Sequence, residues 1–253
     1  MEIELKSELA KPKMRSYLSF GGGVNSVAML LMLHEQKADF EAVFVNHGTD
    51  WPETYEYLEM LQGWLEKKGL PKITVLKPNV TGFDNLYEYC WKYQMVPQIH
   101  PRWCTYRFKI KTIISYCKPP AFQLIGFSSD ESQRAKISIE AGVENRFPLI
   151  ENDITRDGCK EIIKTHGLPV PIKSGCFICP FQRPDQWKKL RRLSPDLFCK
   201  AEQLEKRNIE YRKSKGKEAM YLSPSKAPLS AIVNEKQSKL WVQDEYPPCN
   251  CML

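Results

Sequence analysis

Three consecutive glycines, Gly21 to Gly23, stand between an apolar run and a helix-like stretch. Because glycine has no Cβ, its backbone N–H groups can come close to an anion, and the N-terminus of a helix adds partial positive charge. Asn25 and Ser26 follow at positions where a side chain can cap the helix or bind a phosphate oxygen. The alternative, a tight turn that binds no ligand, would explain a single glycine but is a poorer explanation for three in succession. The segment therefore predicts a strand, a phosphate-binding turn and a helix.

Short apolar runs alternate with helix-like stretches through the first half of the chain. This alternation predicts an α/β fold, namely a doubly wound, mostly parallel sheet covered by helices. The expected strands are residues 16–20, 42–46, 73–76 and 122–125, and the expected helices are residues 26–36, 52–68, 86–93 and 108–117. Glycine-rich turns of such a sheet bind ligands at the carboxyl ends of the strands.

The pattern changes near residue 153, where strands give way to helix-prone and proline-rich sequence. A helix is expected over residues 159–166, an irregular loop over 167–184, and basic helices up to about Lys217. The chain is therefore predicted to comprise a nucleotide-binding α/β domain, residues 1–152, and a helical, cysteine-bearing C-terminal extension, residues 153–253.

Nine cysteines occur in a chain that shows neither an apolar run of about 18 residues nor an export signal at its start. We therefore expect a cytoplasmic protein that does not enter a membrane and whose thiols stay reduced. Metal binding or thiol chemistry then explains the cysteines better than disulfides. The net charge of +7 and the basic run near Lys188 fit a nucleic-acid surface and a solvated helix about equally.

Cys176 and Cys179 form a CxxC motif in a loop bounded by glycine and proline. Such a loop lets two thiolates face one metal centre, either zinc or iron. Redox-active dithiols share the motif, but they are expected at the start of a helix, which Pro180 disfavours. Cys90 and Cys117 lie in apolar helical patterns and are expected to pack in the core, whereas Cys159, after an Asp-Gly turn, is expected to be half exposed.

Residues 21–26 resemble the PP-loop of ATP pyrophosphatases, whose usual form is SGGxDS, with glycine in place of the serine and Asn25 in place of the aspartate. The following segment NHGTDWPET resembles the DTGxxFPET stretch of phosphoadenylyl-sulfate reductases, with matches at Asn46, Gly48, Pro52, Glu53 and Thr54. The segment GFSSDESQR resembles the GxxxxExxR stretch of the same group through Gly126, Glu131 and Arg134. The resemblance implies an adenine nucleotide α-hydrolase-like fold of the PP-loop superfamily, in its phosphoadenylyl-sulfate reductase-like branch.

The segment from Cys104 to Lys109 resembles the CCxxxK stretch that supplies cluster ligands in adenylyl-sulfate reductases, with Thr105 at the second cysteine. The resemblance implies a [4Fe-4S] cluster held by Cys104, Cys176 and Cys179. Its fourth iron would be bound by Cys199, Cys249 or Cys251, with Cys249 preferred, or would be left open. Zinc is the rival metal for four thiolates.

The resemblance also implies roles for individual residues. Nucleotide binding is expected from Gly21, Gly22, Gly23, Asn25, Ser26, Asn46, Gly126 and Glu131, and catalysis from Lys109, Arg134 and Cys251. The tail with Cys251 resembles the mobile C-terminal tail that carries the catalytic cysteine of the reductases. Competing interpretations are ordinary loop polarity for Asn46 and His47, and a surface ion pair for Glu131 and Arg134.

Three functions are compatible with these residues. The first is ATP-dependent sulfur transfer with ATP, Mg²⁺ and the [4Fe-4S] cluster as cofactors. The expected acceptor is nucleic acid, DNA before tRNA, as in DNA phosphorothioation, and the expected sulfur donor is a protein such as a cysteine desulfurase. The second is a sulfonucleotide reductase that releases sulfite and uses thioredoxin. The third is a non-catalytic nucleotide-binding subunit, because the loop departs from the PP-loop pattern at two positions. A homo-oligomer is compatible with each, and the sequence does not name the acceptor, the donor or the fourth iron ligand.

Overall fold

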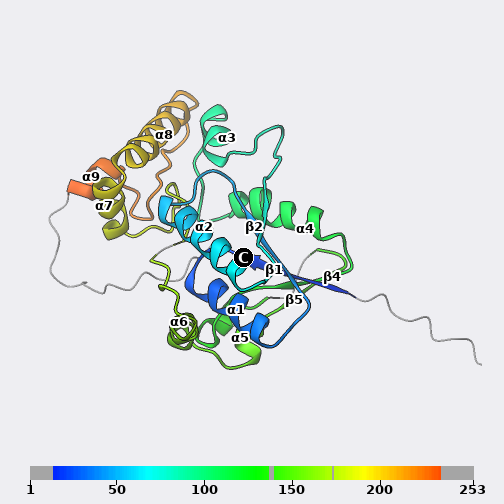
Figure 1. Cartoon of the computed structure of the whole chain (residues 1–253). Helices are drawn as coiled ribbons and strands as arrows, with labels where there is room; N and C mark the ends of the chain where they lie inside the picture. Colours follow the sequence, from blue (N-terminus) through cyan, green and yellow to red (C-terminus); the bar gives the residue numbers. More distant parts are fainter. Residues whose placement is uncertain (1–13, 137–139, 173, 235–253) are drawn as a thin grey trace, which may run out of the picture.

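Five parallel strands form the central sheet of the molecule (Figure 1). The structure is a computed structural model that describes residues 14–136, 140–172 and 174–234. The strands are β1 (Arg15–Phe20), β2 (Glu41–Val45), β3 (Thr74–Leu76), β4 (Ala121–Leu124) and β5 (Val143–Arg146). Their order is β3-β2-β1-β4-β5, and every neighbouring pair is parallel, which confirms the predicted α/β class.

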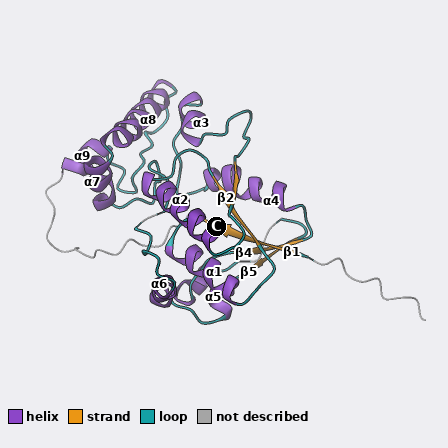
Figure 2. Ribbon diagram, in the orientation of Figure 1, coloured by secondary structure: helices purple, strands orange, loops and turns teal. Residues whose placement is uncertain are grey.

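Helices cover the sheet and form a separate group at one end of the molecule (Figure 2). They are α1 (Val24–Glu35), α2 (Pro52–Lys67), α3 (Leu86–Lys92), α4 (Lys111–Cys117), α5 (Pro148–Glu151), α6 (Arg156–Thr165), α7 (Pro184–Leu193), α8 (Pro195–Ser214) and α9 (Leu229–Asn234). A π-helical turn over Thr105–Ile110 leads into α4, and a 3-10 helix covers Ser129–Arg134. No helix of the described residues is both long and apolar enough to cross a bilayer.

The strand order reverses direction at β1. The chain runs from β1 outward through β2 to β3, and it then returns to the other side of β1 with β4 and β5. In the register of the sheet, Leu18 of β1 pairs with Ala42 of β2 on one side and with Leu124 of β4 on the other. Gly21 and Gly126 therefore follow the carboxyl ends of two adjacent strands whose connections diverge, which is where open α/β sheets bind ligands.

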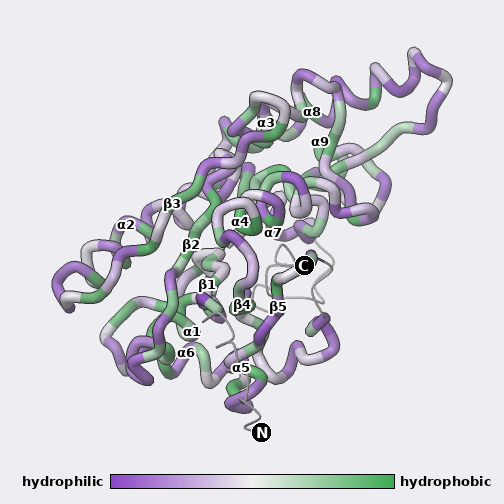
Figure 3. The backbone as a smooth tube through the Cα atoms, turned by 90° about the vertical axis from the view of Figure 1, so that its right-hand side faces the viewer, coloured by the Kyte–Doolittle hydropathy of each residue, from purple (hydrophilic) through white to green (hydrophobic). Residues whose placement is uncertain are grey.

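Helix α1 is buried on all sides, since every residue from Val24 to Leu33 is buried. It packs against the sheet and against α6, and side chains such as Leu30 and Ile163 share its core. Burial of each such side chain stabilises the fold by about 1.5–3 kcal/mol. In Figure 3 hydrophobic residues run along α1 and β2, whereas α8 alternates hydrophilic and hydrophobic stretches. The start of α1 is therefore held firmly at the sheet edge.

A second core joins α3 to the C-terminal helices. Trp51 and Phe108 lie in it together with Trp187 and Leu204. The first core likewise takes Ile163 from beyond residue 152. Both cores thus contain side chains from each side of residue 152, and the division of the chain into residues 1–152 and 153–253 stays a prediction.

The structure differs from the sequence-based expectations in three elements. Strand β5 has one buried residue, Val143, in four, so no apolar run marked it. The helix expected from residue 108 starts at Thr105 as a π-helical turn. Cys159 is fully buried on the inner face of α6 and not half exposed. Burial raises the pKa of the Cys159 and Cys117 thiols to about 12, so both are inert core residues.

Glu205 is a buried carboxylate that ties the segment after α8 back onto that helix. Its oxygens accept hydrogen bonds from Leu222 N and Leu229 N, both at 2.8 Å. Because Glu205→Ala leaves two buried N–H groups without acceptors, we expect it to lower the free energy of unfolding by about 2–4 kcal/mol. Thermal unfolding measures the loss. Glu210→Ala, an exposed site on the same helix, should change stability little; equal effects of the two substitutions would refute this role.

Candidate active site

The glycine loop lies against three other segments so closely that side chains would not fit at the contacts. Gly22 has φ +71°, and a Cβ there would lie 2.9 Å from Thr54 Cγ2. A Cβ on Gly23 would lie 2.6 Å from Ser174 Oγ, and one on Gly126 would lie 3.3 Å from Ser26 N. The loop therefore packs on the start of α2, on the segment before the CxxC motif and on the end of β4.

The N-terminus of α1 follows the carboxyl end of β1 and has no side-chain cap. Ser26 instead stabilises the turn, because its hydroxyl accepts from Gly21 N at 3.3 Å and donates to Gly23 O at 3.0 Å. The backbone N–H groups of the first helical turn and the helix dipole then favour an anion at this point. The arrangement agrees with the phosphate-binding turn expected from the sequence.

Asn25 joins the loop to the 3-10 helix after β4. Its Nδ2 donates to Glu131 Oε2 at 2.7 Å and to Ser128 Oγ at 3.2 Å, while Arg156 Nη1 lies 3.4 Å from its Oδ1. Glu131 also forms an ion pair with Arg134. The structure thus brings Asn25, Glu131 and Arg134 together, and the last two form the ion pair that was the competing interpretation of their spacing, although largely buried and not at the surface.

An amide at position 25 suits the buried Glu131 better than a carboxylate would. Asn25→Asp places two carboxyls at hydrogen-bond distance, which raises the pKa of the added carboxyl above its unfolded value. Arg156 faces the pair and offsets part of the repulsion. We expect a loss of about 1–2 kcal/mol at pH 7, which disappears as the pH falls towards about 4, because the folded state then binds more protons than the unfolded state. Unfolding midpoints of the variant and the native chain at the two pH values test this; a pH-independent loss would contradict it.

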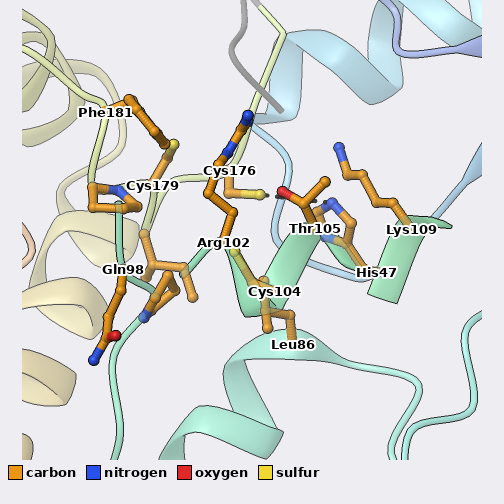
Figure 4. Close-up of a pocket in the computed structure, with 13 residues that line it drawn as sticks. His47, Leu86, Gln98, Arg102, Cys104, Thr105, Lys109, Cys176, Cys179 and Phe181 are labelled. Atoms are coloured by element: carbon orange, nitrogen blue, oxygen red, sulfur yellow. Dashed lines mark hydrogen bonds between the residues drawn. The ribbon is translucent and has the colours of Figure 1, made fainter. Parts of the chain in front are cut away.

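A pocket beyond the loop gathers the three predicted cluster cysteines and the predicted catalytic lysine. It is lined by His47, Leu86, Pro97, Gln98, Arg102, Cys104, Thr105, Lys109, Cys176, Ile178, Cys179, Pro180 and Phe181. Figure 4 shows Cys104, Cys176 and Cys179 on one side of this pocket and Lys109 beside His47. Residues far apart in the sequence therefore converge as the resemblance implied.

The π-helical turn explains how Cys104 and Lys109 share the pocket. Cys104 stands at its N-terminal boundary, and Lys109 lies five residues further on. Because a π-helix repeats its hydrogen bonds from i to i+5, residues at that spacing lie on similar faces, and such turns occur often at functional sites. Thr105 is buried next to Cys104, where the resemblance expected a second cysteine.

The CxxC loop is irregular and held by hydrogen bonds, and its prolines predicted an irregular loop. Cys179 N donates to Cys176 O at 3.2 Å, which closes a turn between the two cysteines. Buried Gln182 donates to Phe177 O at 3.0 Å and accepts from Trp51 Nε1 at 3.2 Å. The motif does not start a helix, since α7 begins at Pro184, so the site lacks the geometry expected of a redox dithiol.

The segment from Ser174 to Cys176 connects the cysteine pocket with the nucleotide loop. Ser174 contacts Gly23, and two residues later Cys176 forms an antiparallel bridge with Asp50. Trp51 N donates to Gly175 O at 3.0 Å in the same bridge. The anion site and the thiol pocket are therefore neighbours that share one short stretch of chain.

Two pocket residues, His47 and Arg102, were not expected from the sequence as functional groups, nor was Asp50, which lies beside His47. His47 and Asp50 follow β2 and are buried. Arg102 stacks on the Phe181 ring at 5.1 Å, and its buried Nε and Nη2 have no hydrogen-bond partner among the described residues. A guanidinium with open donors suits an anionic ligand. Their position just past the parallel strand β2 is the signal in the sequence that could have identified His47 and Asp50.

Other predicted residues lie elsewhere. Asn46 stabilises its own loop, since its Oδ1 accepts from Gly48 N at 3.0 Å and from Tyr55 OH at 3.2 Å. Burial, with Asp50 nearby, raises the pKa of Tyr55, so its hydroxyl stays protonated. Cys199 is exposed on α8 and does not line the pocket. Cys249 and Cys251 lie outside the described residues.

The three pocket thiols are not grouped as closely as a single zinc ion requires. Tetrahedral zinc holds its thiolate sulfurs about 3.8 Å apart. Among the described residues, the Sγ atoms of Cys104, Cys176 and Cys179 do not form a group within 4.8 Å. Each iron of a cubane takes its own thiolate, which requires wider spacing. Cys90 lies near Cys104, but burial raises its pKa well above the usual range, so it belongs to the core.

Sequence comparison assigns the chain to a class. A model of the phosphoadenosine phosphosulfate reductase domain matches residues 15–170, and the chain belongs to this family, in the PP-loop superfamily. An uncharacterized protein of Methanocaldococcus jannaschii is 25% identical over 199 residues, which are 72% of this chain and 45% of that protein. The chain thus spans less than half the length of this curated relative.

One solved structure shows the same fold, and a second is more weakly similar. Phosphoadenylyl-sulfate reductase of Candida auris, in a phosphate complex, matches with a TM-score of 0.50 and 16% identity over 65% of this chain and 82% of that chain. A U34-tRNA thiolase of Methanococcus maripaludis with its [4Fe-4S] cluster matches with a TM-score of 0.41 and 17% identity over 81% of this chain and 74% of that chain.

Proposed function

We propose that this chain is an ATP-dependent sulfurtransferase that combines a PP-loop nucleotide site with a [4Fe-4S] cluster. The observation that carries the proposal is the Ser174–Cys176 segment, which packs on Gly23 at one end and supplies a pocket thiol at the other. Phosphoryl chemistry at the loop and sulfur chemistry at the cysteines would then take place side by side.

In this proposal the glycine loop and the N-terminus of α1 bind the phosphates of ATP. The acceptor oxygen attacks the α-phosphorus and pyrophosphate leaves. Hydrosulfide then attacks the acceptor atom that carries the adenylylated oxygen, AMP departs with that oxygen, and the hydrosulfide proton is released to solvent. Lys109 and Arg102 line the neighbouring pocket and would hold negative charge that develops on the phosphates, and Arg134 would support the loop through its ion pair with Glu131. Mg²⁺ would offset charge on the leaving pyrophosphate.

Cys104, Cys176 and Cys179 would hold the cluster, which supplies an iron that can bind sulfide. The surrounding chain limits water around these thiols, because Cys176, Ile178 and Leu86 are buried. Nucleic acid, DNA before tRNA, is the proposed acceptor, since α7 and α8 carry many lysines and arginines. A cysteine desulfurase or a similar protein is the proposed sulfur donor.

A sulfonucleotide reductase is the second candidate, favoured by the family to which residues 15–170 belong. It would cleave the sulfonucleotide with a thiolate of Cys249 or Cys251 and release sulfite without ATP. Cys251→Ala should then abolish sulfite release and spare the metal. Equal metal loss in Cys251→Ala and Cys176→Ala would instead identify Cys251 as a ligand.

Parallel anaerobic reactions test the proposal. The full chain is incubated with labelled ATP, sulfide and DNA or tRNA, and separately with phosphoadenylyl sulfate and reduced thioredoxin. We expect pyrophosphate from ATP and label transferred from sulfide to nucleic acid. Sulfite from phosphoadenylyl sulfate without pyrophosphate from ATP would support the reductase, and nucleotide binding without turnover would support a non-catalytic subunit.

A further inference from the structure

His47, Asp50 and Cys176 bring one nitrogen, one oxygen and one sulfur together in the interior of the protein. Their ligand atoms all lie within 4.8 Å of one another, and all three residues are buried. His47 Nε2 is 3.6 Å from Cys176 Sγ and 3.5 Å from Asp50 Oδ2. Within the described residues this is the one group of three such donors at that spacing.

These separations match the edges of a tetrahedron around one metal ion. With metal–nitrogen and metal–oxygen bonds of about 2.1 Å and a metal–sulfur bond of about 2.3 Å, tetrahedral angles place nitrogen about 3.6 Å from sulfur and about 3.4 Å from oxygen. The measured distances, 3.6 Å and 3.5 Å, lie close to both values. A single ion would therefore need little movement of these side chains.

The backbone holds the ligands in place before any ion binds. Asp50 and Cys176 face each other across an antiparallel bridge. Thr49 O accepts from Phe177 N at 2.8 Å in the same bridge, and Thr49 Oγ1 lies 2.8 Å from His47 Nδ1. When Nδ1 donates its proton to Thr49, Nε2 presents its lone pair towards Cys176 and Asp50, as in metal-binding histidines.

Asp50 adds an independent observation. Its Oδ2 is buried and accepts no hydrogen bond within the described residues. Burial of a carboxylate oxygen without a partner is costly, and a bound cation removes that cost. The oxygen lies next to the imidazole and the thiol, so the cation that would satisfy it also meets two further ligands.

We propose that His47 Nε2, Asp50 Oδ2 and Cys176 Sγ bind one divalent ion of the zinc class, with the fourth coordination position taken by a ligand from the pocket. Three protein ligands and one exchangeable ligand are typical of catalytic zinc sites. The ion displaces the thiol proton of Cys176, which is released to solvent. Because Cys176 is shared, this site and the cluster of the proposed function exclude each other, and the metal available decides which forms.

Cobalt(II) is the probe, because its absorption reports tetrahedral geometry and thiolate ligation. The metal-free, reduced full chain is titrated with Co²⁺ under anaerobic conditions. We expect one Co²⁺ per chain, a thiolate-to-cobalt charge-transfer band and tetrahedral ligand-field bands. Zn²⁺ should displace Co²⁺. Absence of these bands would overturn the proposal.

Variants identify the ligands. His47→Gln and Asp50→Asn should weaken Co²⁺ binding by about tenfold or more, whereas the Cys104→Ser/Cys179→Ser double variant should bind Co²⁺ as the native chain does. His47→Cys should restore binding with a stronger charge-transfer band, which shows that the fold tolerates the change. His166→Gln, directly after α6, is the matched histidine control. Equal loss in the double variant would mean that the cysteines alone hold the ion, and would refute the proposal.

The cluster is measured separately as iron and acid-labile sulfide after anaerobic reconstitution. The bound iron should depend on Cys104 and Cys179 but not on Asp50. Co²⁺ binding should show the opposite dependence. A failed Co²⁺ titration with a normal iron content overturns the single-ion site alone, and absence of iron with normal Co²⁺ binding overturns the cluster alone.

Discussion

Cys176→Ser and Cys179→Ser are expected to remove essentially all iron and acid-labile sulfide from anaerobically purified protein, a decrease of roughly tenfold or more. The physical reason is that both thiols line the pocket and a cubane cluster needs a thiolate at each liganded iron. Iron content and the charge-transfer absorbance of the cluster measure the result.

Cys199→Ser is the matched control for these two substitutions. Its thiol is exposed on α8, away from the pocket lining, so we expect native iron content. Thermal unfolding of all three variants separates loss of the cluster from loss of the fold. Iron retained in Cys176→Ser, or lost equally in Cys199→Ser, would contradict the assignment of the ligands.

Lys109→Ala is expected to lower the rate of pyrophosphate release by about 10²–10³-fold at saturating ATP. Lys109 lines the thiol pocket, where its ammonium can stabilise charge that develops on the phosphates. Since the interaction is strongest in the transition state, kcat should fall more than KM rises, and Lys109→Arg should restore part of the rate. Steady-state kinetics with labelled ATP measure both constants.

Lys111→Ala provides the control, because Lys111 is exposed and lies over the Tyr106 ring at 5.2 Å. We expect native kinetics and native iron content in this variant. An unchanged kcat in Lys109→Ala, or an equal decrease in Lys111→Ala, would remove Lys109 from the catalytic residues.

Much of the sheet could be predicted because its signals are local. The apolar run before Gly21, the turn itself and the buried α1 are continuous in sequence, and β1, β2 and β4 start and end within one residue of expectation. Strand β5 was not predicted because its own residues are largely polar, as an edge strand allows. Its position depends on pairing with β4, and a short stretch of sequence does not reveal that pairing.

The thiol pocket was predictable only through resemblance. Cys104 and Cys176 lie far apart in sequence, and composition alone does not bring them together. His47 and Asp50 escaped for the same reason: their partner Cys176 is reached through a backbone bridge between two loops. His47 stands just after β2, but its chemistry depends on a contact with a residue 129 positions further along the chain.

The proposed function requires that nucleotide phosphates and the metal-bound thiols occupy adjoining parts of one site. An anaerobic crystal structure with a non-hydrolysable ATP analogue measures this most directly. The account predicts the phosphates at Gly21–Gly23 against the N-terminus of α1, and a metal centre on Cys104, Cys176 and Cys179 on the other side of Ser174. Phosphates bound away from the glycine loop, or a pocket whose cysteines bind no metal in the iron-replete protein, would contradict it.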